Sequence, residues 1–284
     1  MKEKFKLLNP FSQALMLVII GVVSFILLSI ILNLAYQTAF PELPMNKVNE
    51  LIESYPIHYM ILNFLPLQVG FFLIPGIIYW SLSRLNKSIT LKTNSTVYVW
   101  SILLFLCAFF LLPFFSEINI EIVQFNFESL LKQKEQSDLQ LKKLVGEVGS
   151  TSFYVAILTI GLLTGIAEEL AFRRFLFHHM FTNTQSLKKA LFSSAFIFAL
   201  LHFNYLQILP LFTFGLVLGM MYYVTGSLIP GIIMHAANNM INVYWLASDN
   251  FPEWMEEINL YTTIPATAVL LLLVILYKRK KGNI

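Results

Sequence analysis

Three short stretches of the chain place acids, histidines and amides inside otherwise apolar sequence. They are residues 165–174 (GIAEELAFRR), 198–202 (FALLH) and 235–239 (HAANN). A charged side chain in apolar surroundings is costly unless it has a partner, so these groups are expected to meet one another. The three stretches are therefore the first places to look for chemistry.

Helical spacing gives the two neighbouring acids different surroundings. Residues four apart share one helix face, so Glu169 faces Arg173, with the acid on the favourable N-terminal side. A bidentate pair would hold Glu169 ionised and in place. Glu168 points about 100° away and is directed at another helix. The pattern predicts Glu168 as a general base and Glu169 as its support.

The two histidine stretches supply groups suited to acyl transfer. His235 and Asn239 are four residues apart, so they share a helix face, and both can donate hydrogen bonds to a developing oxyanion. His202, from a third helix, can orient or deprotonate a water molecule together with Glu168. These residues together predict hydrolysis of a carbonyl compound by an activated water.

The composition indicates that these groups lie in a membrane protein. Hydrophobic residues make up 57% and charged residues 12% of the chain, and the mean hydropathy is +0.70. Soluble domains are roughly 45–50% apolar and about 25% charged. The net charge of +3 forms no basic patch, so we expect no nucleic-acid partner. The single cysteine, Cys107, excludes a disulfide framework and a thiol metal site.

Apolar runs near the ~20 residues needed to cross a bilayer recur along the chain. The fold class they predict is an all-α polytopic membrane protein with about eight transmembrane helices. The first run is too long for the core of a signal peptide, so we expect it to be retained as a helix. The eight predicted spans are Ala14–Tyr36, Tyr59–Leu82, Thr96–Phe115, Ser152–Phe172, Ala190–Tyr205, Leu206–Val224, Leu228–Ala247 and Tyr261–Tyr277.

Basic residues alternate between the two sides of these spans, as the positive-inside rule requires. Both the N and the C termini are therefore expected to be cytoplasmic, with the protein as a multi-pass component of the cell membrane. The acidic loop Asp249–Glu257 suits the opposite side. The residues assigned to the cytoplasmic side are Lys2, Lys4, Lys6, Arg84, Lys87, Lys92, Arg173, Arg174, Lys188, Lys189, Lys278, Arg279, Lys280 and Lys281.

Three regions are expected along the chain. Residues 1–150 hold three N-terminal spans and an outer loop, residues 151–250 a catalytic helical core, and residues 251–284 the last span with a basic tail. Within the loop 116–150, the spacing of apolar residues leaves open an amphipathic surface helix, a lid, or a solvated connector with a helical stretch. Two pairs of glycines, Gly161 with Gly165 and Gly215 with Gly219, are typical of helices that pack closely in lipid.

Three motifs in order carry a resemblance to a known family. Glu-Glu-x-x-x-Arg, Phe-x-x-x-His and His-x-x-x-Asn on successive apolar helices resemble the CAAX prenyl protease and bacteriocin-processing family, also called Abi or CPBP, of intramembrane glutamic endopeptidases. The resemblance covers about Ser152–Ala247 and includes the linking phrase 226–231 (GSLIPG). It implies a membrane-embedded hydrolase similar to a type II CAAX prenyl protease, acting on a peptide or lipidated-peptide substrate among membrane lipids.

The resemblance also implies a role for each matched residue. Glu168 would activate water with help from His202, and His235 with Asn239 would stabilise the oxyanion. Glu169 and Arg173 would support the site. No cofactor is expected. A zinc-dependent variant remains open because two histidines and a carboxylate can bind zinc, although the helical His-Glu-x-x-His signature is absent.

Two other classes of protein share some of these features. A non-catalytic membrane scaffold or immunity protein would keep the same fold and motifs. A transporter would use intramembrane acids and histidines as a proton relay, but the chain has no clear inverted repeat.

The predicted spans place the candidate residues at different depths. At about 1.5 Å per residue, Glu168 lies near the cytoplasmic boundary, His235 deeper and His202 deeper still, a spread of roughly 10 Å. The groups meet only if helices tilt or if the fourth helix continues to about Phe181. His178 and His179, which match no motif, are predicted to be surface residues.

Overall fold

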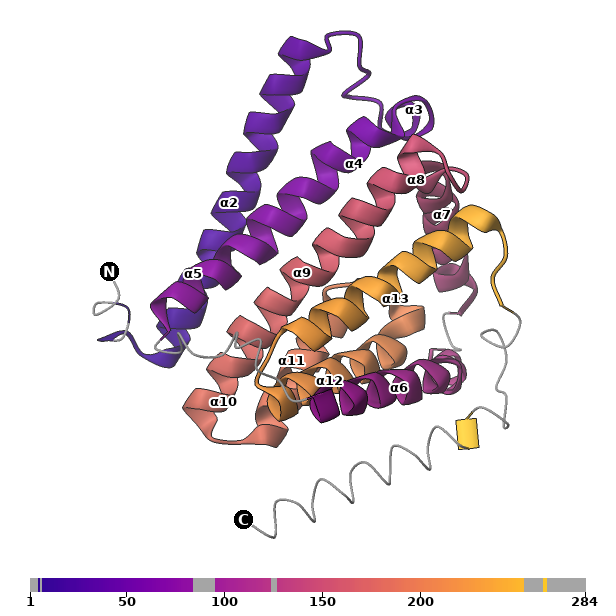
Figure 1. Cartoon of the computed structure of the whole chain (residues 1–284). Coiled ribbons are helices and arrows are strands. Elements are labelled where there is room, and N and C mark those ends of the chain that lie inside the picture. Colours follow the sequence, from indigo (N-terminus) through magenta and orange to yellow (C-terminus); the bar gives the residue numbers. More distant parts are fainter. Residues whose placement is uncertain (1–4, 6, 84–94, 124–126, 253–262, 265–284) are drawn as a thin grey trace. The chain divides into compact units, whose positions relative to one another are not determined.

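The structure is a computed structural model that describes residues 5, 7–83, 95–123, 127–252 and 263–264 (Figure 1). Within these ranges every regular element is a helix and no strand occurs, which confirms the all-α class. The chain divides into two compact units. The first comprises Met1–Ser88, Glu135–Ala190 and His235–Asn250, and the second comprises Ile89–Lys134, Leu191–Met234 and Phe251–Ile284.

Five of the described helices are long and apolar enough to cross a membrane, and the chain is a multi-pass membrane protein. The predicted fifth span is the shorter helix α11 (Leu187–Leu200), and the predicted seventh is α13 (Ile229–Ser248), whose histidine and asparagines lower its hydropathy. The last predicted span lies almost wholly outside the described residues. The total of eight spans and the cytoplasmic termini therefore stay predictions. The five helices are Pro10–Ala39, Pro56–Leu82, Ser101–Ile122, Thr151–Thr184 and Tyr205–Thr225.

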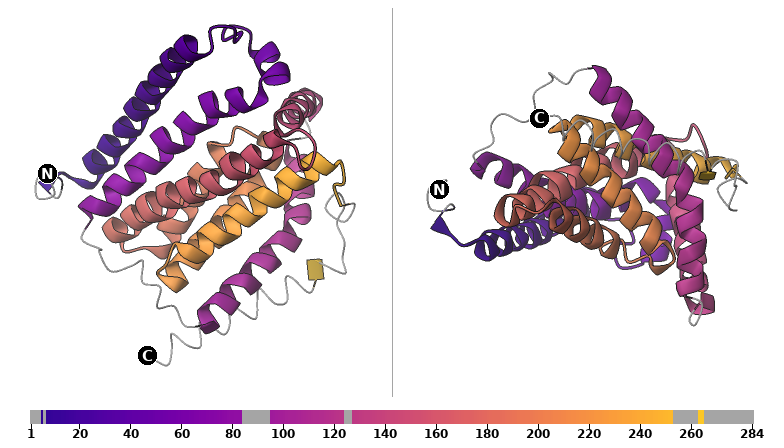
Figure 2. Two further views of the ribbon diagram at one scale, coloured as in Figure 1. Left: turned by 45° about the horizontal axis from the view of Figure 1, so that its top comes forward. Right: turned by 90° about the horizontal axis from the view of Figure 1, so that it is seen from below.

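Three helices lie side by side in the first unit (Figures 1 and 2). The outer helix is α2 (Pro10–Ala39). The central helix consists of α4 (Pro56–Leu65), the π-helical segment η1 (Pro66–Leu73) and α5 (Ile74–Leu82), after a short α3 (Val48–Ser54). The third consists of α8 (Thr151–Ala156), η3 (Ile157–Leu163), α9 (Thr164–Glu169), η4 (Leu170–Phe177) and α10 (His178–Thr184).

The third helix of this unit is longer than the sequence predicted. It continues past Phe172 to Thr184, so the alternative in which it reaches about Phe181 is confirmed. Arg173 and Arg174 were placed in a cytoplasmic loop, but both lie within the helix and are 1% exposed. The polar residues are paired inside the bundle and do not end the helix. Its π-helical turns, η3 and η4, are a form that often occurs at functional sites.

The histidines that follow Arg174 are also part of this helix. His179 is 4% exposed and its Nε2–H donates to the Pro10 carbonyl oxygen at 2.9 Å. Its prediction as a surface residue is wrong, because the helix continues and packs this face against the start of α2. His178 is half-buried, and its Nδ1 is hydrogen-bonded to the Tyr79 hydroxyl at 2.9 Å.

The region predicted as an outer loop is largely helical. Helix α6 extends from Ser95 to Ile122, and α7 spans Phe127–Val145. A turn follows, in which Gly146 and Gly149 have φ angles of +70° and +87°, a region that glycine adopts without strain. The chain then enters α8, where the Ser150 side chain accepts a hydrogen bond from Phe153 N–H at 3.1 Å. A helix is therefore observed in this segment, as each alternative allowed, and the choice among a surface helix, a lid and a solvated connector stays a prediction.

The last turn of α7 fastens that helix to the first unit. Leu144 and Val145 are buried in an apolar cluster whose other members come from α3, from the start of the central helix, from α8 and from α13. Two lysines in the same turn form ion pairs, Lys142 with Asp249 and Lys143 with Glu53. The buried residues of the cluster are Ile52, Met60, Leu144, Val145, Phe153, Ala156 and Val243.

The second unit contains α6, the first part of α13, a single 3₁₀ turn η5 (Tyr205–Gln207) and α12 (Ile208–Thr225). Helix α12 packs along α6. In the same unit, a Cβ atom at Gly215 would lie 3.0 Å from both Cα and Cβ of Ala195, so α12 and α11 approach closely there. The role predicted for this glycine, close helix packing, is confirmed.

Candidate functional site

Two glycines bring α13 against the helix that carries the acids. A Cβ atom at Gly165 would lie 2.8 Å from the Ala236 backbone nitrogen and 3.0 Å from its Cα. One turn earlier, a Cβ atom at Gly161 would lie 2.7 Å from Cγ of Met240. The backbones are therefore in near contact, as small residues permit in lipid. Because Ala236 follows His235 directly, this contact places His235 beside the acidic turn.

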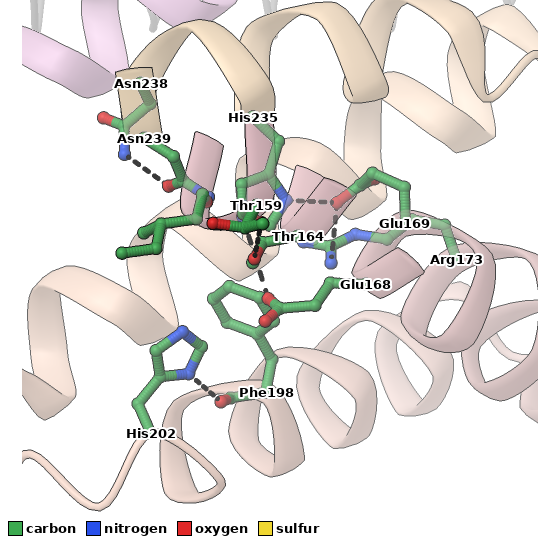
Figure 3. Close-up of polar contacts among 11 residues, drawn as sticks. Thr159, Thr164, Glu168, Glu169, Arg173, Phe198, His202, His235, Asn238 and Asn239 are labelled. Atoms are coloured by element: carbon green, nitrogen blue, oxygen red, sulfur yellow. Dashed lines mark hydrogen bonds and ion pairs between the residues drawn. The ribbon is translucent and has the colours of Figure 1, made fainter. Parts of the chain in front are cut away.

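Glu169, Arg173 and His235 form a buried network (Figure 3). Arg173 Nη1 forms an ion pair with Glu169 Oε1 at 3.0 Å, which is the i, i+4 pair expected from the sequence. The same carboxylate oxygen accepts from His235 Nδ1–H at 2.9 Å. The three residues are 1–2% exposed, so both contacts are shielded from solvent. Charge-assisted bonds of this length are the strong ones in proteins, and they fix the position of the His235 ring.

Glu168 lies on the other side of the same imidazole. Its Oε2 is 3.7 Å from His235 Nε2, which is longer than a hydrogen bond. The residue as a whole is 5% exposed. The two acids therefore divide as their spacing indicates. Glu169 is engaged by Arg173 and His235, whereas Glu168 sits at the Nε2 side of the ring.

The charges of the four side chains can sum to zero. Glu168 and Glu169 contribute two negative charges and Arg173 one positive charge. When His235 carries protons on both ring nitrogens, its positive charge balances the set. A buried site in an apolar bundle favours such neutral combinations, because an unbalanced charge there is costly.

Asn239 lies one turn beyond His235 on α13. Its Nδ2 donates to the Ile160 carbonyl oxygen in η3 at 3.4 Å, and its Oδ1 accepts from Asn238 Nδ2 at 3.4 Å (Figure 3). Both bonds are at the long end of the accepted range, so the amide is held weakly. The first unit thus brings together Glu168, Glu169, Arg173 and His235, with Asn239 on the same helix as the histidine.

His202 belongs to the second unit, just after α11. Its Nδ1–H donates to the Phe198 carbonyl oxygen at 2.7 Å, and the two rings pack with centroids 4.6 Å apart. A carbonyl oxygen only accepts, so Nδ1 is the protonated nitrogen and Nε2 is the acceptor in the neutral ring. This tautomer suits a base acting through Nε2. A meeting of His202 with Glu168 stays a prediction from the sequence.

The segment after His202 is secured by a residue that the sequence analysis did not single out. Asn119 on α6 is 1% exposed. Its Nδ2 donates to the Tyr205 carbonyl oxygen at 2.8 Å, and its Oδ1 accepts from Leu209 N–H at 3.0 Å. One amide thus ties the η5 turn and the start of α12 to α6. Asn119 lies just past the predicted third span, in the 116–150 segment predicted as an outer loop, so no local signal in the sequence marked it.

A second buried arginine was also missed as a structural element. The Arg174 guanidinium lies over the Trp80 ring at 5.8 Å, and its Nη2 is 3.5 Å from the Ser83 hydroxyl. With the Tyr79–His178 bond, these contacts join the ends of the central and third helices. Arg174 therefore stabilises the packing between these two helix ends.

The arrangement defines a class of protein: a multi-pass membrane protein with two glutamates, an arginine and a histidine buried together inside its helices. Residues 150–241 match the family model described as type II CAAX prenyl endopeptidase Rce1-like. Comparison with curated proteins and with solved structures gives no match. The matched segment contains all the candidate residues, so the resemblance drawn from the three motifs is confirmed. It supports a function of the CAAX-type membrane protease kind.

Proposed function

We propose that this chain is an intramembrane endopeptidase that hydrolyses a peptide bond of a peptide or lipidated-peptide substrate within the cell membrane. The observation that carries the proposal is the buried turn in which Glu169 is held by Arg173 and His235 while Glu168 faces the other side of the histidine. The two adjacent carboxylates therefore have different contacts, as a reaction requires in which one acts as the base and the other holds the histidine in place. The family match over residues 150–241 supports the same reaction.

In the proposed reaction Glu168 acts on water. Its carboxylate takes a proton from a water molecule whose oxygen forms a bond to the scissile carbonyl carbon. The carbonyl π electrons move onto oxygen, which gives a tetrahedral oxyanion. The oxyanion electrons then re-form the carbonyl as the C–N bond breaks, and the proton passes from Glu168 to the leaving nitrogen. A carboxylic acid and an amine result, and the acid then loses its proton to the amine or to water. His202 assists the first proton transfer through Nε2, which accepts a hydrogen bond from the Glu168 carboxyl once that group holds the proton.

His235 and Asn239 are proposed to receive the charge of the oxyanion. The bond from His235 Nδ1–H to Glu169 leaves Nε2 as the nitrogen directed toward Glu168. A proton on Nε2 makes this nitrogen a donor, and the ionised Glu169 stabilises the resulting imidazolium. The weak bonds of the Asn239 amide allow it to exchange the Ile160 carbonyl for the oxyanion. Preorganised donors of this kind contribute a factor of about 10²–10³ each in rate.

The proposal includes a metal-free mechanism. Both contacts of the Glu169 oxygen are to cations or N–H donors, so this carboxylate serves as an acceptor and His235 Nδ1 as a donor. A zinc-dependent reaction would use the lone pair of the other ring nitrogen, His235 Nε2, and the Nδ1–H bond to Glu169 is compatible with such a ligand. The alternative is decided by zinc analysis of purified active protein together with activity after chelation. Stoichiometric zinc and loss of activity would overturn the metal-free assignment.

The experiment that tests the function is a comparison of protein termini by mass spectrometry of whole cells. Cells would express the parent, Glu168→Gln, or the matched control Glu147→Gln at equal levels; Glu147 is exposed and lies outside the site. We expect new termini in the parent and the control that vanish in Glu168→Gln. Identical profiles from all three folded proteins would refute the protease and favour a scaffold or immunity protein.

A further inference from the structure

A glutamine in the second span has a buried polar atom without a partner. Gln68 lies in η1, at the middle of the Pro56–Leu82 helix, and is 4% exposed. No hydrogen-bond partner for its Oε1 exists among the described residues. A buried amide left unsatisfied costs about 1–3 kcal/mol, and the bilayer core supplies no water to compensate. Because this cost is not offset by any hydrogen bond from the described residues, a functional role for the amide is the explanation to test.

The side of the helix on which Gln68 lies follows from its neighbours. Gly70 touches α2, since a Cβ atom there would lie 2.7 Å from the Phe25 Cα. Residues two apart lie on nearly opposite faces of an α- or π-helix, so Gln68 faces away from α2. Residues four apart share a face, so Gln68 lies on the side of Phe72. The Phe72 ring contacts the Phe172 ring at 5.7 Å, on the helix that carries the acids.

The contact between the Phe72 and Phe172 rings also shows which residues of the third helix lie beside Gln68. The central and third helices run in the same direction, because Met60 contacts Thr159 near their starts and Tyr79 contacts His178 near their ends. One turn before the Phe72–Phe172 contact lie Gln68 on the central helix and Glu168 on the third.

Packing of the two segments agrees with this level. The segment η1 packs directly against α9, the turn that holds both acids. The buried amide of Gln68 is therefore on the face and at the level of Glu168.

We infer that Gln68 is a further residue of the reaction site and orients the water that Glu168 activates. The inference rests on the proposed peptidase function. Gln68 Oε1 and the Glu168 carboxylate both accept hydrogen bonds, and a water molecule has two O–H donors, one for each. A water held in this way keeps a lone pair directed at the carbonyl carbon. Its proton on the Glu168 side is transferred, while Gln68 neither gains nor loses a proton.

The test uses Gln68→Met, which keeps the length of an unbranched side chain and removes the amide. In cells we expect the Glu168-dependent termini to fall by about 10- to 100-fold, as a misplaced reactant requires. The melting temperature of the purified full chain should stay equal or rise, because the unsatisfied amide is gone. The matched control is Asn63→Met, an exposed amide on the same helix, which should leave the termini unchanged.

Each outcome bears on the inference. Termini at the parent level in Gln68→Met would overturn it. A loss of termini accompanied by a lower melting temperature would assign Gln68 to packing and would also overturn it. If the parent and Glu168→Gln give the same termini, the proposed function itself fails, and this result is distinct because it does not involve Gln68. For a peptide spanning an identified cleavage site, we expect a lower kcat with KM unchanged.

Discussion

Replacing Glu169 by glutamine should destabilise the protein, whereas the same change at Glu168 should mainly abolish turnover. Glu169 Oε1 forms an ion pair with Arg173 Nη1 at 3.0 Å and accepts a hydrogen bond from His235 Nδ1–H at 2.9 Å, and all three residues are 1–2% exposed. Removing this acid leaves a buried arginine without its compensating charge, which costs about 3–5 kcal/mol. Glu168 is 3.7 Å from its neighbouring histidine nitrogen, a longer contact than those of Glu169, so its neutral isostere should destabilise the protein less than the change at Glu169.

The assay for this prediction is unfolding of the purified protein in mixed detergent micelles, followed by the fluorescence of its tryptophans. Parent, Glu168→Gln and Glu169→Gln are compared with Glu147→Gln, an exposed acid-to-amide control. A double-mutant cycle with Arg173→Met should return a coupling energy of about 1–3 kcal/mol between Glu169 and Arg173. Equal destabilisation by the two site variants, or no coupling in the cycle, would refute the separation of roles.

The remaining predictions concern helix contact, the His202 segment and metal. Gly165→Ala should cost about 1–3 kcal/mol and lower activity, because its new methyl group meets the Ala236 backbone at 2.8 Å. Gly161→Ala meets only a flexible methionine side chain, so unfolding measurements should find a smaller loss; the reverse order would contradict the backbone contact. Asn119→Leu removes the amide that holds the turn after His202 and should lower activity at least 10-fold, with a loss of about 1–3 kcal/mol from two unpaired backbone groups. Full activity of Asn119→Leu would show that the turn needs no such tie. Incubation with a strong chelator should leave the rate of cleavage within two-fold of the parent, and a rate restored only by added zinc would contradict this.

The fold class and the general location of the site were predictable from local sequence. Long apolar runs specify helices because the bilayer leaves backbone groups no other partners. The pairing of Glu169 with Arg173 followed from four-residue spacing alone, and it is present in the structure at 3.0 Å. The close approach at Gly161 and Gly165 was also indicated by their spacing, but the sequence did not say which helix would fill it.

The end of the third helix was not predictable from hydropathy. Arg173, Arg174 and His179 look like residues of a loop at the membrane surface, and a hydropathy window ends the span before them. In the structure they are buried because each has a partner in three dimensions: Glu169 for Arg173, Trp80 and Ser83 for Arg174, and the Pro10 carbonyl for His179. A hydropathy scale includes the cost of burying a charged residue, but it does not include the interaction with a partner from another part of the chain.

The sequence by itself determined which residue types are present and how they repeat along each helix, and this was enough to indicate a membrane protein with an acidic, histidine-containing site. Only the tertiary structure decided that His235 bonds to Glu169, that Asn119 ties the turn after His202, and that the Gln68 Oε1 atom is buried with no hydrogen bond from the described residues. The physical reason is that helical periodicity fixes the relative directions of residues within one helix. Which faces of different helices meet depends on packing between segments far apart in the chain.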